Sequence, residues 1–152
     1  MTKKMFLIIS LFILLAIISS LYAYFVNEKE NEFKEIQINN NTFEVEIADT
    51  AMSQTKGLSG RESLDKNKGM LFVFNGYAKR SFWMINMNFY LDILWIKDGV
   101  IVGIAKNTVP LKLNNEKAKI YYSPEPVDMV LEINAGLSDK LDIKIGDKIN
   151  GV

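Results

Sequence analysis

Residues 92–105 have the sequence DILWIKDGVIVGIA, in which two apolar runs flank Asp98 and Gly99. An Asp-Gly pair in this position is typical of a two-residue β-hairpin, because a type I′ turn needs positive φ at both central residues. The stretch therefore predicts two antiparallel strands joined by a tight turn. Counting back from the turn without a bulge places Asp92 opposite Ala105.

Further strands are expected on both sides of this hairpin. Apolar or alternating runs predict them at 36–38, 42–48, 70–74, 81–84 (a neighbour of 70–74), 127–133 and the end of 143–149. Asp49 or Thr50 is expected to begin a short helix that ends near Gly57, and 136–141 to form one helical turn. We therefore expect an α+β domain that is mostly β, a compact barrel-like antiparallel or mixed sheet with one or two short outer helices.

An apolar run without a charged residue extends from Met5 to Val26, and Lys3 and Lys4 precede it. Its 22 residues span roughly 33 Å as a helix, enough for a hydrocarbon core of about 30 Å. Lysines on the short N-terminal side favour a cytoplasmic N-terminus, so we expect a single transmembrane helix in the cell membrane and an extracytoplasmic domain. Cleavage as a secretory signal, which would give a secreted protein, is the alternative. Such signals have apolar cores of about 7 to 15 residues and a small-x-small site, to which Leu21 is unsuited.

The chain is expected to have three parts: a signal anchor over 1–26, a charged tether over 27–35 and one domain over 36–152. Without the two lysines of the anchor, 16 of the 18 basic residues remain against 18 acidic ones, a net charge of −2. That balance gives no electrostatic basis for binding nucleic acid. His and Cys are absent, which excludes Ser-His-Asp triads, Cys nucleophiles, disulfides and thiolate or imidazole metal sites. We expect neither a cofactor nor a metal.

Arg61 and Arg80 are the only arginines among the 18 basic residues. Arginine has a planar fork that can meet a carboxylate with two parallel hydrogen bonds, which lysine cannot do. Asp92 has apolar neighbours, and an unpaired buried charge is costly. We therefore expect a salt bridge from Arg61 to Asp92 or to Glu132 that ties a loop to the sheet.

Five segments carry a resemblance to a known family. They are Gly57-Leu58-Ser59-Gly60-Arg61, Gly69-Met70-Leu71-Phe72-Val73-Phe74, Phe82-Trp83-Met84-Ile85-Asn86-Met87, Leu91-Asp92 and Leu131-Glu132-Ile133-Asn134-Ala135-Gly136. In order and spacing they resemble the motifs of the DUF192 domain, a prokaryotic family of uncharacterised function, over 36–149. The resemblance implies a compact, mostly β fold with short helices, often exported or tethered to a membrane. Ile85 and Met87 stand where the family usually has a basic residue and Thr, which predicts a more apolar pocket around Asn86.

Polar groups from distant segments recur at the ends of the predicted apolar strands. We expect Arg61, Trp83, Asn86, Asp92 and Glu132 to line one cleft that binds a small polar ligand or a partner protein without catalysis. A structural or interaction module without a ligand is one alternative, because motifs of this kind also serve folding alone.

A second alternative is a hydrolase or lyase that acts on a glycan, with Asp92 and Glu132 as an acid and base pair. Two carboxylates can do such work when they lie roughly 5 to 9.5 Å apart. The aromatic side chains of Phe74, Phe82 and Trp83 leave a further choice open. They either line a groove for a ring-shaped ligand or belong to the core, where strand aromatics are found more often.

Overall fold

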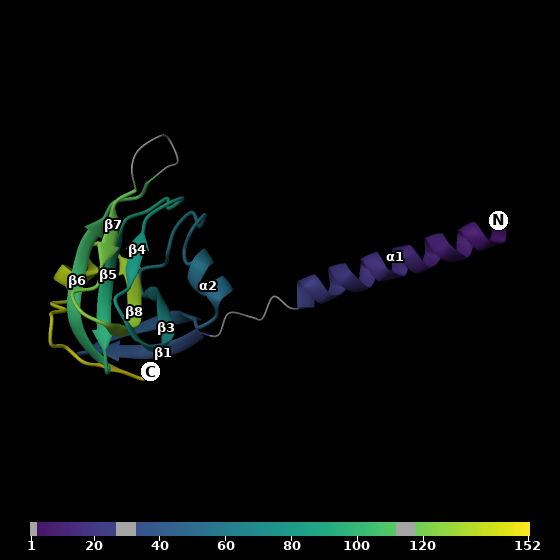
Figure 1. Ribbon diagram of the computed structural model, residues 1–152. Helices are drawn as coiled ribbons and strands as arrows, with labels where there is room; N and C mark the ends of the chain where they lie inside the picture. Colours follow the sequence, from purple (N-terminus) through teal and green to yellow (C-terminus); the bar gives the residue numbers. More distant parts are fainter. Residues whose placement is uncertain (1–2, 27–32, 112–117) are drawn as a thin grey trace. The chain divides into compact units, whose positions relative to one another are not determined.

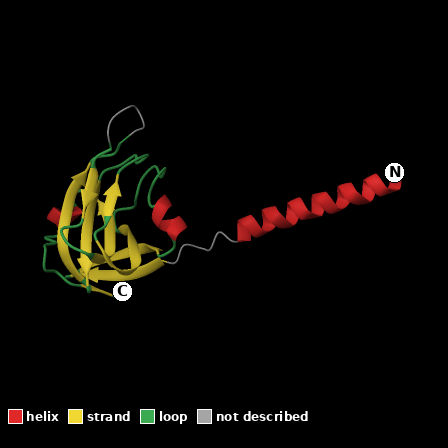
Figure 2. Ribbon diagram, viewed as in Figure 1, coloured by secondary structure: helices red, strands yellow, loops and turns green. Residues whose placement is uncertain are grey.

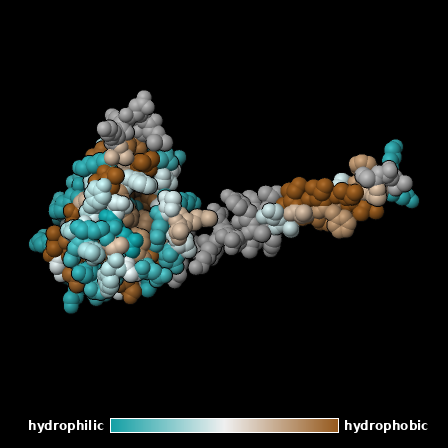
Figure 3. All heavy atoms as spheres, viewed as in Figure 1, coloured by the Kyte–Doolittle hydropathy of each residue, from teal (hydrophilic) through white to brown (hydrophobic). Residues whose placement is uncertain are grey.

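The computed structural model describes residues 3–26, 33–111 and 118–152, which belong to two compact units, Met1–Glu32 and Phe33–Val152. In the first unit, α1 (Lys3–Val26) is a helix with apolar side chains along most of its length (Figure 3). By length and composition it is able to cross a membrane, a property that secretory signals share. Residues 27–32 of the expected tether lie outside the described residues. Residues 33–35 were wrongly placed in that tether, because they begin a strand.

The second unit is built on a curled, half-barrel sheet of seven strands (Figures 1 and 2). Its strand order is β6-β5-β8-β3-β2-β1-β9, and every pair is antiparallel except β2 and β3. The seven strands are β1 (Phe33–Ile38), β2 (Asn41–Ala48), β3 (Lys68–Ala78), β5 (Leu91–Lys97), β6 (Val100–Thr108), β8 (Val127–Asn134) and β9 (Ile149–Asn150). Two strands, β4 (Ser81–Trp83) and β7 (Ile120–Tyr122), form a separate small sheet, and α2 (Ala51–Lys56) and α3 (Leu137–Lys140) are short helices. The expected α+β, mostly β fold is confirmed.

The hairpin around Asp98 and Gly99 is confirmed, with φ values of 50° and 72° at these two residues. The expected register of its far end is wrong. Opposite Trp95 and Ile96 a bulge adds a residue, Val102, to β6, so that Ile93 pairs with Ala105 in place of Asp92. The extra residue cannot be read from the alternation pattern, because residues 100–105 of β6 are apolar or Gly at every position and both faces of β5 are apolar.

The helix α2 forms where the sequence predicts it. The Thr50 side chain accepts a hydrogen bond from the Ser53 amide at 3.1 Å, and the Ser53 hydroxyl accepts one from the Thr50 amide at 3.0 Å, which makes a capping box. Gly57, with φ of 49°, ends the helix. Gln54 Nε2 donates to the carbonyl oxygens of Ala48 and Val73, at 3.2 and 2.7 Å, and so fixes α2 against β2 and β3.

The neighbours of the 70–74 strand differ from the expectation. Residues 81–84 were expected beside it, but β4 pairs with β7, and β3 lies between β2 and β8. The strand β3 begins at Lys68, directly after a turn at Lys66 and Asn67. A side chain on Gly69 would place its Cβ 2.8 Å from the carbonyl oxygen of Glu132, so the close approach of β3 and β8 requires glycine there.

Alternating side chains of the large sheet form two hydrophobic clusters. The first-face cluster includes Leu71, Leu94, Ile96, Leu131 and Ile133, together with Ile36, Ile38, Phe43, Val45, Ile101, Ile143 and Ile149. The second-face cluster includes Met70, Phe72, Ile93, Trp95 and Val130, together with Ala48, Leu58, Met84, Met87, Leu91, Tyr121 and Val127. Both clusters lie within 36–149, so the domain Phe33–Val152 carries its own core.

Candidate functional site

A partly open cavity of about 560 Å³ lies over the second face of the sheet. This volume is within the range of roughly 300 to 1,000 Å³ that is typical of small-molecule sites. Its charged lining residues are Lys56, Lys79, Arg80 and Glu132. Its other lining residues are Ala51, Gln54, Thr55, Gly57, Leu58, Ser59, Phe72, Phe74, Ser81, Phe82, Trp83, Ile85 and Met87. The walls therefore come from α2 and the segment after it, β3, the β3–β4 connection, β4 and the segment after it, and Glu132 of β8.

The aromatic wall of the cavity is continuous with the core beneath it. Phe72 and Phe82 meet edge to face, with ring centroids 4.8 Å apart and an interplanar angle of 89°. Phe82 makes a second edge contact with the buried Trp95, at 5.5 Å and 76°. Such pairs add about 0.5–1.5 kcal/mol beyond area burial. Phe82 thus serves both as core and as cavity wall, and Trp83, 56% exposed, lies at the rim.

Glu132 lies in the middle of β8, paired with Met70 of β3 and Ile93 of β5, and lines the cavity from the sheet. The residue is only 5% exposed. Its carboxyl group makes no hydrogen bond or ion pair with any residue that the structure describes. Burial raises the pKa of Glu132 from 4.5 to about 8. At neutral pH the group is therefore mostly a neutral acid that is able to donate a hydrogen bond.

The cationic side of the cavity is formed by Lys79 and Arg80, between β3 and β4. The guanidinium carbon of Arg80 lies 3.9 Å from the ring centroid of Phe74, and its Nη2 donates to the carbonyl oxygen of Gly76 at 3.0 Å. Arg80 Nε is fully enclosed and has no acceptor, the one such side-chain nitrogen or oxygen atom among the described residues, whereas the unpaired oxygens of Glu132 open onto the cavity. Lys79 Nζ donates to the carbonyl oxygen of Pro124 at 2.6 Å. Across 33–111 and 118–152, no carboxylate pairs with either side chain.

Of the five site residues expected from the sequence, the cavity brings together only Trp83 and Glu132. Arg61 does not bind Asp92 or Glu132, and that expectation is wrong. Its Nη2 lies 2.8 and 2.7 Å from the two carboxylate oxygens of Glu46 on β2. Glu46 alternates with Val45 and Ile47 in β2, a pattern typical of a strand with one face in solvent. It is in fact only 6% exposed, because the loop that carries Arg61 covers it.

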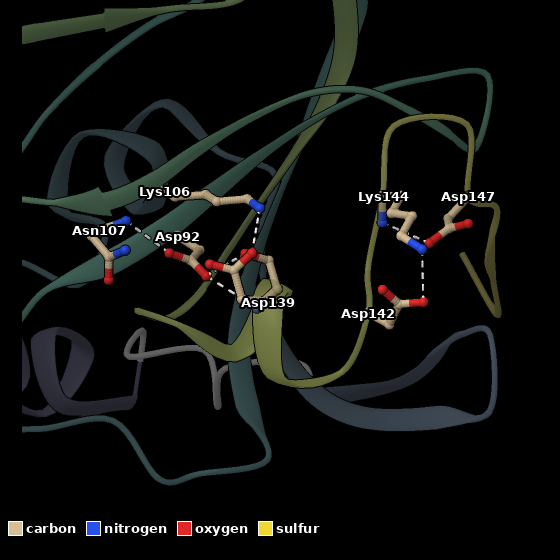
Figure 4. Close-up of polar contacts among 8 residues, drawn as sticks. Asp92, Lys106, Asn107, Asp139, Asp142, Lys144 and Asp147 are labelled. Carbon is tan, nitrogen blue, oxygen red and sulfur yellow. Dashed lines mark hydrogen bonds and ion pairs between the residues drawn. The ribbon is translucent and has the colours of Figure 1, made fainter.

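Asp92 is fully buried and its carboxylate is already satisfied by the protein (Figure 4). Oδ2 accepts hydrogen bonds from the amide and hydroxyl of Ser138, at 3.0 and 2.6 Å, and Oδ1 accepts one from the Asn107 amide at 2.8 Å. Asp92 pairs with Ile133 of the first-face cluster, whereas Glu132 pairs with Ile93 of the second. Because paired residues point to the same side of a sheet, the two carboxyl groups lie on opposite faces. They form no acid and base pair in one cleft.

Asn86 organises the backbone near the cavity without lining it. It has φ of 58°, its amide donates to Leu111 at 3.0 Å, and its carbonyl oxygen accepts a hydrogen bond from the Gly60 amide at 2.9 Å. The neighbours of Asn86, Ile85 and Met87, do line the cavity. These are the two positions where the sequence departs from the motif pattern, and they make this wall apolar.

Lys56, Lys79 and Arg80 are cavity residues that sequence reasoning did not place in a site. The scarcity of arginine singled out Arg80, but no spacing signal connected it to Glu132, 52 positions later in the chain. Within the described residues, no group of three or more His, Cys, Asp or Glu side chains is arranged to hold a metal ion.

The fold and this cavity define the class: a small, β-rich domain with a ligand-sized cavity on one face of a curled half-barrel sheet. The chain belongs to the DUF192 family, described as uncharacterized ACR, whose model matches residues 34–151. No curated protein matches the chain.

Two solved structures are similar to the chain, each at 32% sequence identity. A crystal structure of a candidate transcription regulator from Sinorhizobium meliloti 1021 has a TM-score of 0.74, and the match covers 82% of this chain and 97% of that one. A crystal structure of a protein of unknown function from Novosphingobium aromaticivorans DSM 12444 has a TM-score of 0.73, and the match covers 81% and 88% of the two chains.

Proposed function

We propose that this protein is a membrane-anchored binding domain that holds a small, ring-containing molecule in its cavity without changing it chemically. The observation that carries the proposal is the Glu132 carboxyl group, 5% exposed and without a partner among the described residues, in a cavity of about 560 Å³. The carboxyl oxygens are not among the fully enclosed polar atoms that lack a partner, so they open onto the cavity. A ligand that accepts a hydrogen bond from this carboxyl group would complete the site.

The shape and lining of the cavity support a ligand with a flat apolar body. Phe72, Phe74, Phe82 and Trp83 come from two strands and line the same space. Apolar and aromatic walls with a few polar groups are the usual composition of small-molecule sites, in which the polar groups fix orientation. Strongly perturbed pKa values such as that of Glu132 also concentrate at functional sites.

Binding without catalysis is favoured by what surrounds Glu132. It is the only carboxyl group among the described residues that line the cavity. Asp92, the expected second carboxylate of a glycan hydrolase, lies on the opposite face and is held by Ser138 and Asn107. The bonds of Asp92 and the Arg61–Glu46 ion pair favour purely structural roles for Asp92 and Arg61. Those roles do not explain why the Glu132 carboxyl group lines the cavity without a partner among the described residues.

The anchor belongs to the same proposal. An apolar helix of 24 residues, Lys3–Val26, begins with two lysines. Because positively charged flanks stay on the cytoplasmic side, the domain is proposed to lie outside the cytoplasm, tethered to the cell membrane. Cleavage of the helix would release the same domain as a secreted protein.

Titration of the isotope-labelled domain 33–152 with indole, a neutral ring-shaped probe, tests the binding function by amide NMR. Saturable shifts are expected at cavity residues such as Gly57, Phe82 and Trp83. Ala51 lines the cavity and the next residue, Met52, does not, so Ala51→Trp is expected to weaken binding while Met52→Trp leaves it unchanged. Shifts that do not saturate, or that respond equally to the two substitutions, would contradict the proposal.

A further inference from the structure

We infer that the cavity selects an organic anion with a ring-shaped body, whose acidic group lies at Lys79 and Arg80 and whose ring packs against Phe72 and Phe82. The inference rests on the proposed function, because it names the class of ligand for the same cavity. The distribution of charge, the unpaired donor of Arg80 and the position of the aromatic wall carry it.

The charges that line the cavity are strongly biased toward positive. Three cations, Lys56, Lys79 and Arg80, share the lining with one acid, Glu132. Even with Glu132 ionised the lining has a net charge of +2. The whole chain, by contrast, has a formal net charge of zero. A positively lined cleft with low-dielectric walls concentrates anions.

The Arg80 guanidinium is held in place and keeps unused donors. Its stacking on Phe74 and its bond to Gly76 fix the group, while Nε has no acceptor. Arginine matches a carboxylate better than lysine because its planar fork offers parallel donors. Lys79 adjoins it in sequence and bonds only to the main-chain oxygens of Ser123 and Pro124. An acidic ligand group is the partner that both side chains lack.

Glu132 permits an anion at neutral pH because its burial keeps it mostly protonated. A neutral carboxylic acid donates a hydrogen bond to an acceptor on the ligand. The rival guest is an amine that pairs with ionised Glu132. With a pKa of about 8, removing that proton at pH 7 reduces amine affinity by about tenfold. The amine also meets the repulsion of Lys56, Lys79 and Arg80.

Three probes with one ring system and different charge test the inference. They are indole-3-acetate, the neutral indole-3-ethanol and the cationic tryptamine, each titrated calorimetrically into the domain 33–152 at pH 7. We expect the acid to bind about tenfold more tightly than the alcohol, and the alcohol more tightly than the amine. Tightest binding of the amine would overturn the anion assignment.

Substitutions locate the preference in the cavity. Arg80→Gln is expected to reduce the ratio of acid to alcohol affinity by about tenfold. Lys79→Gln, at an exposed position, should reduce the ratio severalfold and covers the case in which Arg80→Gln does not fold. Lys97→Gln, outside the cavity lining, is the matched control and should leave the ratio unchanged.

The outcomes separate this inference from the proposed function. If indole and indole-3-ethanol bind but the acid has no advantage, the anion assignment fails and the binding function stands. If the ratio is unchanged in both cavity variants, the assignment to Lys79 and Arg80 fails. If none of the indole probes binds, the binding function itself is contradicted.

Discussion

Glu46 and Glu132 lie on the same face of the sheet, on either side of Met70. Glu46 pairs with Met70 across the β2–β3 ladder, and Met70 pairs with Glu132 across the β3–β8 ladder. Two strand spacings separate their main chains, roughly 9.5 Å. Both carboxyl groups are buried, but only Glu46 has a cation, Arg61. The fold therefore neutralises one carboxylate internally and leaves the other to be neutralised by protonation or by a ligand.

Glu132 is expected to make the domain less stable as the pH rises. Its pKa is about 8 in the folded protein against 4.5 for the free side chain. The folded state therefore retains a proton that the unfolded state loses, and stability decreases between about pH 4.5 and 8. Glu132→Gln removes this dependence. Urea unfolding should show the variant gaining several kcal/mol over the native domain between pH 5 and pH 9. Glu44→Gln, at an exposed position, should track the native domain; parallel curves for Glu132→Gln would refute the assignment.

The affinity of the domain for an anionic probe is expected to depend on the same titration of Glu132. Indole-3-acetate should lose affinity as the pH rises through about 8, because ionised Glu132 repels it. The other charged residues that line the cavity are Lys56, Lys79 and Arg80. Calorimetry from pH 6 to 9 checks this, and Glu132→Gln should give a flat profile. An equally steep loss in that variant would assign the titration to another group.

The Arg61–Glu46 ion pair is expected to stabilise the domain. Arg61→Met leaves the carboxylate of Glu46, whose side chain is 8% exposed, without its partner. We expect a loss of about 2 kcal/mol in the free energy of unfolding. The pair of Lys97 with Glu125 has side chains 38% and 44% exposed. Lys97→Met should therefore cost no more than about 0.5 kcal/mol. Equal losses in the two variants would show that the burial of Glu46 has no energetic role.

Asp92→Asn is expected to lower stability by about 2–4 kcal/mol, because an amide nitrogen would face donors from Ser138 or Asn107. Hydrogen exchange should also show faster opening of the Ser138 amide at the start of α3. Asp139, one position later, forms an exposed ion pair with Lys106. Asp139→Asn is therefore the matched control, expected to change stability little. A similar effect of both substitutions would contradict a structural role specific to Asp92.

The orientation of the chain can be measured with single cysteines, because the native sequence has none. Ile145 is 66% exposed in the domain, and Lys3 lies at the start of α1. We expect a membrane-impermeant maleimide to label Ile145→Cys in intact cells, and Lys3→Cys only after permeabilisation. The reverse pattern would contradict the proposed topology, and a product shortened by the length of α1 would show cleavage.

Local chemistry predicted those parts of the fold whose determinants are close in sequence. The Asp98–Gly99 turn and the Thr50 cap of α2 depend on a few adjacent residues, and both form as expected. The bulge at Val102 was missed because β5 and residues 100–105 of β6 are apolar or Gly throughout, so a shift of one residue does not change the pattern.

The candidate site was only partly predictable because its members meet through long-range pairing. Trp83 and Glu132 were identified from their motifs, but the partner of Arg61 depends on which strand its loop covers. Arg80 reaches the cavity because β4 leaves the large sheet to pair with β7. No local pattern in either strand specifies that choice of partner.

The ring of Phe82 touches both the cavity and Trp95, so a guest cannot press on that wall without disturbing the interior. Trp95 is a tryptophan enclosed by the protein, with 2% of its surface exposed. Its near-ultraviolet circular dichroism should therefore change when a ligand fills the cavity. The domain needs no attached dye to reveal when the cavity is filled.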